Sequence, residues 1–237
     1  MKQFSNLYIF CFSSALVLIV AAALSFTSMS LQEKQKGNEE IERKQNILIA
    51  LGVDVDKADV LAKFGQYIEE GGIVIDFNGD IVPDETADGI NLKREQAKPV
   101  EQRLLPVYIA KEDGMIVIPV RGAGMWGPIW GNVALKSDMN TIHGVTFDHA
   151  SETPGLGAEM AGEDFQSRFP ARRLFDNRGN FQSITVQKPG RAIPDTDFHT
   201  VDGLSGGTVT SNRVEEMLRN SLSPYQTYLV NQRNNSN

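Results

Sequence analysis

The chain has 237 residues, of which 41% are hydrophobic and 22% are charged. That composition is typical of a folded globular protein and argues against a disordered chain. The 30 acidic residues outnumber the 23 basic ones, and the basic residues form no block, which argues against nucleic-acid binding. The single cysteine, Cys11, excludes internal disulfides and cysteine-ligated zinc or iron–sulfur sites in the folded part. No histidine pair has metal-ligand spacing, so we expect no metal site.

The N-terminal region predicts a membrane anchor over residues 1–32. No charge occurs between Lys2 and Glu33. The apolar run 7–26 is long enough, at about 1.5 Å per helical residue, to cross a bilayer core of about 30 Å. A cleaved signal peptide is the alternative, with small residues at 21–23. Because the apolar segment of a signal peptide runs to only about 7–15 residues, we favour an uncleaved anchor.

Residues 33–72 predict a polar stalk and a helical segment. Apolar residues recur at helical spacing from Ile41 to Leu51 and again from Val60 to Ile68, which predicts two helices. Beyond them the pattern changes to short β-rich runs separated by Gly, Pro, Asn or Asp.

The segment 73–230 predicts a sheet domain. Residues 78–104 predict a loop with some helix, and residues 111–114 predict a hairpin turn. The fold class is therefore α+β, with one N-terminal transmembrane helix followed by a mixed or antiparallel sheet and flanking helices. The runs that predict strands are 73–77, 107–110, 115–120, 129–135, 142–147 and 183–187.

The C-terminal region predicts one amphipathic helix. Its apolar face extends from Val214 to Leu222, and Ser211 or Asn212 is the expected N-cap. Residues 231–237 form a polar tail that we expect to fray.

Residues 122–127 match a dinucleotide-binding fingerprint. That fingerprint must open into a helix, whereas Pro128 and a further β-rich run follow here. A glycine-hinged turn that presents Trp126 and Trp130 is the better interpretation. Two neighbouring tryptophans suit a plain core position or a face that stacks on a flat ligand, and both interpretations stay open.

Residues 203–207 satisfy the Gly-x-Ser-x-Gly pattern of a hydrolase nucleophile. That fold needs a histidine after the serine, and the three histidines all precede Ser205. Residues 202–211 instead form a glycine-rich and hydroxyl-rich turn that leads into the C-terminal helix. Backbone N–H groups and the helix dipole at such a turn suit a phosphate group.

Three stretches carry a family resemblance. Residues 202–210 (Asp-Gly-Leu-Ser-Gly-Gly-Thr-Val-Thr) resemble the motif Asp-Gly-x-Ser/Thr-Gly-Ala-Thr of proteins that carry FMN in phosphoester linkage to a threonine. Residues 124–131 and 149–159, the latter with Glu-Thr-Pro-Gly-Leu-Gly, look like the same family. With the N-terminal span, the chain resembles the C subunits of the sodium-translocating NADH:quinone oxidoreductase over essentially its whole length. The flavin-carrying G subunit of the related Rnf complex shares two of the motifs and is the alternative.

The resemblance implies a covalent FMN on Thr208. It also implies that a flavin transferase recognises Asp202. The turn beside the phosphate would then consist of Ser205, Gly206 and Gly207. In this chain Gly207 stands where the family usually has Ala, so Thr210 is the fallback acceptor.

The resemblance also implies contacts to the flavin ring. Trp126 is the candidate for stacking. Lys188 either places positive charge near the flavin or is an ordinary surface lysine. Glu152 is equally a structural hydrogen-bonding residue without a redox part. The loop whose backbone hydrogen-bonds the ring edge consists of Glu152, Thr153, Gly155, Leu156 and Gly157.

The activity implied is that of one member of a sodium-pumping NADH:quinone oxidoreductase, inactive alone, which relays electrons through FMN between the other subunits. Its partners are those subunits, a flavin transferase and, through the anchor, membrane lipid. The family holds the flavin domain on the periplasmic side of the inner membrane, whereas the basic residues Lys34, Lys36, Arg43 and Lys44 beyond the span favour the opposite side. A membrane-anchored scaffold with a degenerate acceptor motif is the alternative from another functional class.

Overall fold

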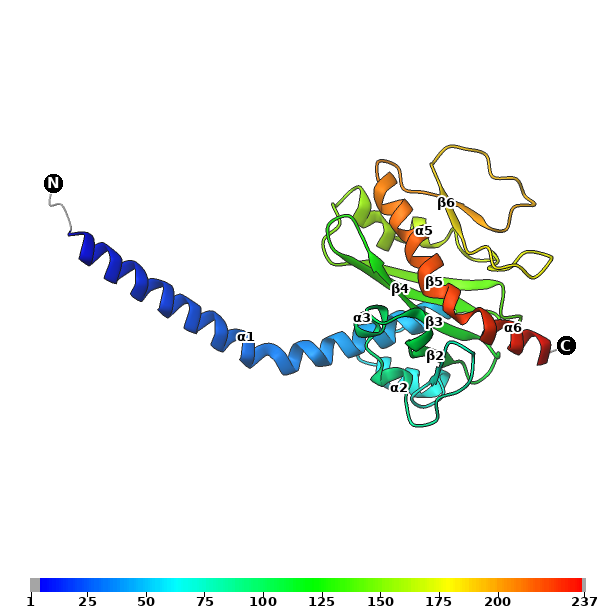
Figure 1. Cartoon of the computed structure of the whole chain (residues 1–237), viewed down its shortest axis with the longest axis horizontal. Coiled ribbons are helices and arrows are strands. Elements are labelled where there is room, and N and C mark those ends of the chain that lie inside the picture. The colour runs from blue at the N-terminus through cyan, green and yellow to red at the C-terminus, as the bar shows by residue number, and fades with distance from the viewer. Residues whose placement is uncertain (1–4, 236–237) are drawn as a thin grey trace. The chain divides into compact units, whose positions relative to one another are not determined.

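The computed structural model describes residues 5–235, so Lys2 and the last two residues of the tail lie outside it. The chain divides into two compact units, residues 1–43 and 44–237. Helix α1 (Asn6–Ala50) makes up the first unit from Asn6 on (Figure 1). An 18-residue stretch of α1 is long and apolar enough to cross a membrane, and none of that stretch is buried within the chain.

Helix α1 differs from the predicted stalk and separate helix over Ile41–Leu51, because it runs unbroken to Ala50. The stalk is rich in Glu, Lys and Gln, which are strong helix formers, and it contains no proline. Its one glycine, Gly37, has open space around it. In the last turn of α1, Ile47 and Leu48 are fully buried in the second unit.

The second unit is built on a five-stranded antiparallel sheet in the order β1-β2-β3-β4-β5, which confirms the predicted fold class. The hairpin turn predicted at residues 111–114 joins β2 to β3. A parallel pair, β6 and β7, forms a second small sheet. The strands are β1 (Ile73–Ile75), β2 (Leu105–Ile109), β3 (Ile116–Ala123), β4 (Pro128–Leu135), β5 (Ile142–His149), β6 (Thr185–Gln187) and β7 (Thr200–Asp202).

Helix α5 packs across β3 and β4 (Figure 1). Alternate residues of β3 and one face of α5 supply the core between them, as the periods of a strand and a helix require. The other helices are α2 (Val60–Tyr67), α3 (Leu92–Gln96), α4 (Glu163–Gln166), α5 (Thr208–Leu222) and α6 (Gln226–Asn235), with 3₁₀ turns η1 (Ala87–Gly89), η2 (Val100–Gln102), η3 (Gly157–Ala161) and η4 (Ser223–Tyr225).

Two expectations about the C-terminal region are wrong. Helix α5 begins at Thr208 with Gly207 at the N-cap position, so neither Ser211 nor Asn212 is the cap. Helix α6 continues to Asn235, so the described part of the tail is helical rather than frayed. The reason is tertiary packing: Tyr228 and Leu229 of α6 are buried in the core.

The end of α1 lies so close to β5 that the strand needs glycine at one position. A Cβ atom on Gly144 would lie 2.5 Å from the carbonyl oxygen of Ala50. We expect Gly144→Ala to lower the free energy of unfolding by about 1–3 kcal/mol, because backbone must move to relieve the overlap. Urea unfolding of the full chain in detergent, followed by tryptophan fluorescence, measures this loss.

Gly65 in α2 provides the matched control, because nothing lies within 4 Å of its added Cβ atom. We expect Gly65→Ala to raise the free energy of unfolding by about 0.5–1 kcal/mol through helix propensity alone. Equal effects of the two substitutions would contradict the close approach of α1 to β5.

Candidate functional site

The acceptor motif turns from β7 into α5. Gly203 donates its N–H to the carbonyl of Gln187 on β6 (2.8 Å), which fixes the start of the turn. Gly206 has a φ of +74°, a conformation that favours glycine. Thr208 is the exposed first residue of α5. Because no side chain caps this helix, the N–H groups of its first turn are available to an anion.

Two side chains brace the turn. The Ser211 hydroxyl accepts from the Leu204 N–H (2.8 Å) and donates to the Gly207 carbonyl (2.9 Å). The Arg168 guanidinium donates to the carbonyls of Asp202 (3.0 Å) and Gly203 (2.9 Å). The turn therefore keeps its shape through contacts on both sides. Sequence reasoning missed Arg168, which lies far from the motif along the chain and carries no motif of its own.

The carboxylate of Glu152 joins three segments at this site. Its Oε1 atom accepts from the N–H groups of Met125 (2.7 Å) and Trp126 (3.1 Å) in the β3–β4 turn. Its Oε2 atom accepts from the Thr210 hydroxyl on α5 (2.7 Å). The Glu152 N–H donates to Nδ1 of His149 at the end of β5 (3.3 Å). Glu152 is only 4% exposed, so its carboxylate serves the protein rather than solvent.

The hydrogen bonds decide the ionisation of this carboxylate. Burial by itself raises the pKa of Glu152, but the donors Thr210, Trp126 and Met125 outweigh burial and hold the pKa below its ordinary value of 4.5. Glycine on either side makes room for the group. A Cβ atom on Gly124 would lie 2.5 Å from Oε1, and one on Gly157 would overlap Oε2 and the Thr210 hydroxyl.

The two candidate acceptor threonines have opposite environments. Thr208 is exposed at the start of α5, whereas Thr210 is 2% exposed and its hydroxyl is bonded to Glu152. The two threonines therefore differ in accessibility, a difference that the sequence did not reveal.

The loop after Glu152 is closed by its own hydrogen bonds. The Thr153 carbonyl accepts from the N–H groups of Leu156 and Ala158 (both 3.1 Å). Gly155, with a φ of +74°, donates its N–H to the Glu159 carboxylate (3.1 Å). The loop also contacts the acceptor turn, since a Cβ atom on Gly206 would lie 2.7 Å from Cδ2 of Leu156.

Exposed apolar side chains lie on the segments that Glu152 and Leu156 bring together. Trp126 at the tip of the β3–β4 turn is 63% exposed, so it is not a core residue. Trp130 is half-buried on β4, opposite Arg121 of β3. Of the two tryptophans, Trp126 is the one free to stack on a flat ligand. The exposed apolar side chains on these segments are Met125, Trp126, Leu156 and Val209.

Lys188 and Asp202 lie at the adjacent ends of β6 and β7. Gln187, which precedes Lys188, pairs with Asp202 in the ladder and donates its side-chain amide to the Asp202 carboxylate (2.9 Å). Lys188 itself is exposed. The fold therefore brings Lys188 close to the start of the acceptor motif.

Two cavities flank the acceptor turn. One of about 590 Å³ is lined by Gly155, Leu204 and Ser205, among others, and one of about 390 Å³ by Asp202, Gly203 and Ser205, among others. Both volumes lie within the range of ligand sites. Among residues 5–235 no cluster of three or more His, Cys, Asp or Glu side chains is arranged to hold a metal ion.

Known proteins are similar to this chain over the same segments. The sequence family described as FMN-binding domain matches residues 124–223, which include both the β3–β4 turn and the acceptor motif. The C subunit of the Na(+)-translocating NADH-quinone reductase of Vibrio vulnificus (strain YJ016) is 32% identical over 219 residues, 84% of each chain. Its namesake in Vibrio anguillarum is 34% identical over 221 residues, 85% of this chain and 84% of its own.

Solved structures agree in fold. The crystal structure of the Na(+)-translocating NADH-quinone reductase C subunit from Parabacteroides distasonis ATCC 8503 has a TM-score of 0.76 and 36% identity, and covers 84% of this chain and 96% of its own. The crystal structure of Shewanella oneidensis NqrC, at 24% identity, has a TM-score of 0.68 over 81% of this chain and 97% of its own, and shows the fold alone.

Glu152 has a measurable effect on stability. We expect Glu152→Ala to lower the free energy of unfolding by about 3 kcal/mol, because it leaves the buried Thr210 hydroxyl and two backbone N–H donors without their acceptor. Glu152→Gln keeps an oxygen for the two N–H donors, so we expect a loss of only about 1 kcal/mol. Urea unfolding at pH 7 tests both values, and equal losses for Ala and Gln would contradict the described hydrogen bonds.

The stabilisation by Glu152 depends on pH. Because the folded-state pKa is lowered, the ionised carboxylate stabilises the protein above pH 4.5 and this contribution is lost as the pH falls through the folded-state pKa. We expect the difference in stability between wild type and Glu152→Gln to shrink below pH 4.5. Urea midpoints measured from pH 7 to pH 3 provide the test, and a constant difference would contradict it.

Proposed function

Because this chain belongs to the family of Na(+)-translocating NADH-quinone reductase C subunits, we propose that it carries FMN in phosphoester linkage to Thr208 and relays electrons within that complex. Its cofactor is FMN, and it is one subunit of an oxidoreductase complex that contains other subunits. Bound FMN supplies the electron-accepting and electron-donating chemistry. The chain's own residues attach, position and surround the cofactor.

The observation that carries the proposal is the environment of Thr208. Its side chain is exposed, and it begins a helix whose first-turn N–H groups are uncapped. A phosphate esterified to its hydroxyl would lie at the positive end of the helix dipole. Gly206 and Gly207 leave the turn without side chains, so a transferase and a phosphate can approach the backbone closely.

The neighbouring segments supply the remaining requirements of a flavin site. Trp126 gives an exposed aromatic face for stacking, and Leu156 and Val209 extend the apolar surface. Lys188 adds positive charge, which favours an anionic reduced flavin. The backbone of the 153–157 loop offers hydrogen bonds to the ring edge. Glu152 positions the turn that carries Trp126. Both of its carboxylate oxygens already accept hydrogen bonds from the protein, so Glu152 does not bind the flavin ring.

The presence of glycine at position 207 can be explained without assuming that the acceptor motif has lost its function. A Cβ atom on Gly207 would lie 2.9 Å from Cβ of Leu204 and 3.3 Å from the Leu156 carbonyl. Glycine at this position therefore suits the tight packing of this particular turn. That reason weakens the scaffold hypothesis, in which Gly207 marks loss of function.

We further propose that a flavin transferase attaches the cofactor and recognises Asp202, that α1 anchors the chain in lipid, and that the flavin domain lies in the periplasm. A cofactor exposed on a periplasmic surface would be lost by dissociation unless it were tethered, which supports the covalent bond. The apolar stretch of α1 supports the anchor.

Substitution of Thr208 and substitution of Thr210 should affect the covalent attachment of FMN differently. In the full chain coexpressed with a flavin transferase, we expect a fluorescent band under denaturing conditions and a mass increase of FMN less one water. Thr208→Ala should abolish both signals, whereas Thr210→Ala should keep the covalent flavin at reduced stability, because it removes a donor to Glu152. In-gel fluorescence and intact mass are the measurements.

Two results would contradict the assignment. Covalent flavin that persists in Thr208→Ala and disappears in Thr210→Ala would move the acceptor to Thr210. An unmodified wild-type chain in the presence of an active transferase would favour the scaffold.

The orientation is tested with single cysteines in a Cys11→Ser background. We expect Asp113→Cys, in the exposed β2–β3 turn, to react with a membrane-impermeant maleimide applied to the periplasm. Ser5→Cys, at the start of the span, should be protected. The reverse labelling pattern would place the flavin domain in the cytoplasm.

A further inference from the structure

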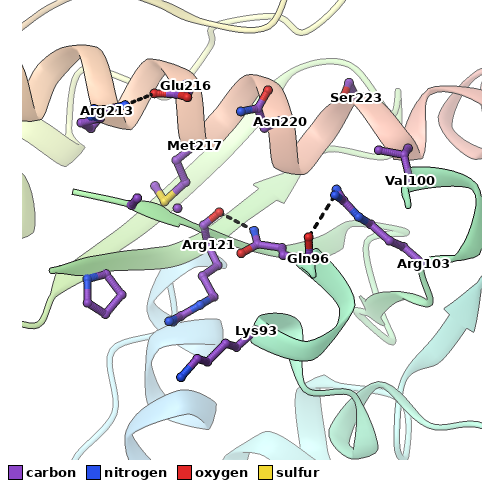
Figure 2. A pocket seen from close by; sticks show the side chains of 13 residues that line it. Lys93, Gln96, Val100, Arg103, Arg121, Arg213, Glu216, Met217, Asn220 and Ser223 are labelled. Carbon is purple, nitrogen blue, oxygen red and sulfur yellow. Dashed lines mark hydrogen bonds and ion pairs between the residues drawn. The ribbon is translucent and has the colours of Figure 1, made fainter. Parts of the chain in front are cut away.

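A second site lies along α5, beyond the acceptor. A groove of about 610 Å³ runs beside α5 from Arg213 to Asn220 and reaches Ser223 at the start of η4 (Figure 2). Four cationic side chains and, among the described residues, one carboxylate line it. This excess of positive charge contrasts with the net charge of −7 on the chain. The charged lining residues are Lys93, Arg103, Arg121, Arg213 and Glu216.

The groove follows an edge of β3 that the sheet does not cover. Strand β2 pairs with β3 only at Val117 and Ile116, so the later part of β3 has no partner strand on that side. The backbone of Arg121 is bonded instead to the Ser221 hydroxyl of α5 (3.2 and 3.0 Å) and to the Gln96 amide of α3 (2.6 Å). Helices α3 and α5 therefore hold the two walls in place.

The cations differ in what they already bind. Arg213 forms an ion pair with Glu216 (2.6 Å), and Arg103 donates to the carbonyls of Gln96 and Lys98 (both 3.1 Å). Within the described residues, the side chains of Lys93 and Arg121 have neither an ion pair nor a hydrogen bond. Both extend away from α5 in Figure 2, on the side of β3 opposite the wall that α5 provides.

The shape of the groove matches an extended chain. Arg213 to Ser223 spans roughly 15 Å of helix, the length of about four to five extended residues. Pro128 adds exposed apolar surface to a lining that is mainly charged and polar, whereas Met217 is almost completely buried. An open groove of this length suits a peptide better than a single small anion. Guanidinium groups pair with carboxylates in a two-pronged geometry, which selects acidic side chains.

We infer that this groove binds an acidic segment of another subunit of the reductase complex. This inference rests on the proposed function, because the partner is taken to be a subunit of the complex in which the chain carries FMN. Gly122, Ala123 and Pro128 of the groove belong to the same β3–β4 hairpin that carries Trp126 at its tip. A partner bound here is held beside the flavin site, where electrons enter or leave.

Charge reversal of the two unpaired cations tests the inference. The full-length, flavinylated chain is bound to an immobilised reductase complex that lacks this subunit. We expect Lys93→Glu with Arg121→Glu to lower the association rate about tenfold at low salt, and the difference from wild type to disappear at high salt. Lys57→Glu with Arg178→Glu, two exposed positions away from the groove, is the matched control and should associate at the wild-type rate.

Covalent flavin content is measured in the same samples. Unchanged flavin content with slower association supports the groove, whereas equal association of both double variants overturns it. Absence of covalent flavin from every sample would contradict the proposed function. The test of the groove would still stand, because it depends only on the association rates.

A photo-cross-linking amino acid in place of Asn220, an exposed residue of the groove, identifies the occupant in the assembled complex. We expect a cross-link to an Asp- or Glu-rich segment of another subunit. Cross-links only to lipid, to a second copy of this chain, or to a segment without acidic residues would overturn the inference.

Discussion

The buried carboxylate of Glu152 is the interaction on which the geometry around Thr208 depends. A charge in the interior is tolerated only when donors replace the water it has lost, and the donors here come from the β3–β4 turn and from α5. Moving either segment would leave one oxygen of the charged group without its donors, so the two segments keep one relative position. The same bond occupies the hydroxyl of the buried Thr210. One side chain therefore fixes the tryptophan turn and leaves Thr208 as the accessible threonine.

Much of the fold was predictable because the strands of the five-stranded sheet pair in sequence order. Each strand pairs with its neighbour in sequence, so local β-rich runs and turn residues were enough to indicate β1 to β5. The failures occur where local signals are weak. Strand β7 has only Val201 as an apolar residue, and nothing in the sequence indicates its parallel pairing with β6. The polar stretch of α1 shows no apolar periodicity, although its composition favours a helix.

The site was predictable as a set of motifs but not as a set of contacts. The glycine- and hydroxyl-rich turn indicated a phosphate site, and the resemblance singled out Glu152 and Trp126. The sequence does not reveal that Glu152 binds the turn of Trp126 rather than a ligand, because residues 27 and 58 positions apart meet only through the sheet. Arg168 was missed for the same reason, since its partners are backbone carbonyls that any residue provides.

The β3–β4 hairpin connects the two sites that the structure offers. At its tip, Glu152 fixes the N–H groups of Met125 and Trp126, and at its free edge Ser221 and Gln96 fix the backbone of Arg121. A hairpin restrained at both points cannot tilt independently of α5, which carries Thr208 at one end and Ser221 near the other. A partner that binds along the groove is thereby placed relative to Thr208 by the rigid body of one helix and one hairpin. That rigidity suits the proposed electron relay, because the distance between redox centres must be reproduced each time the partners meet.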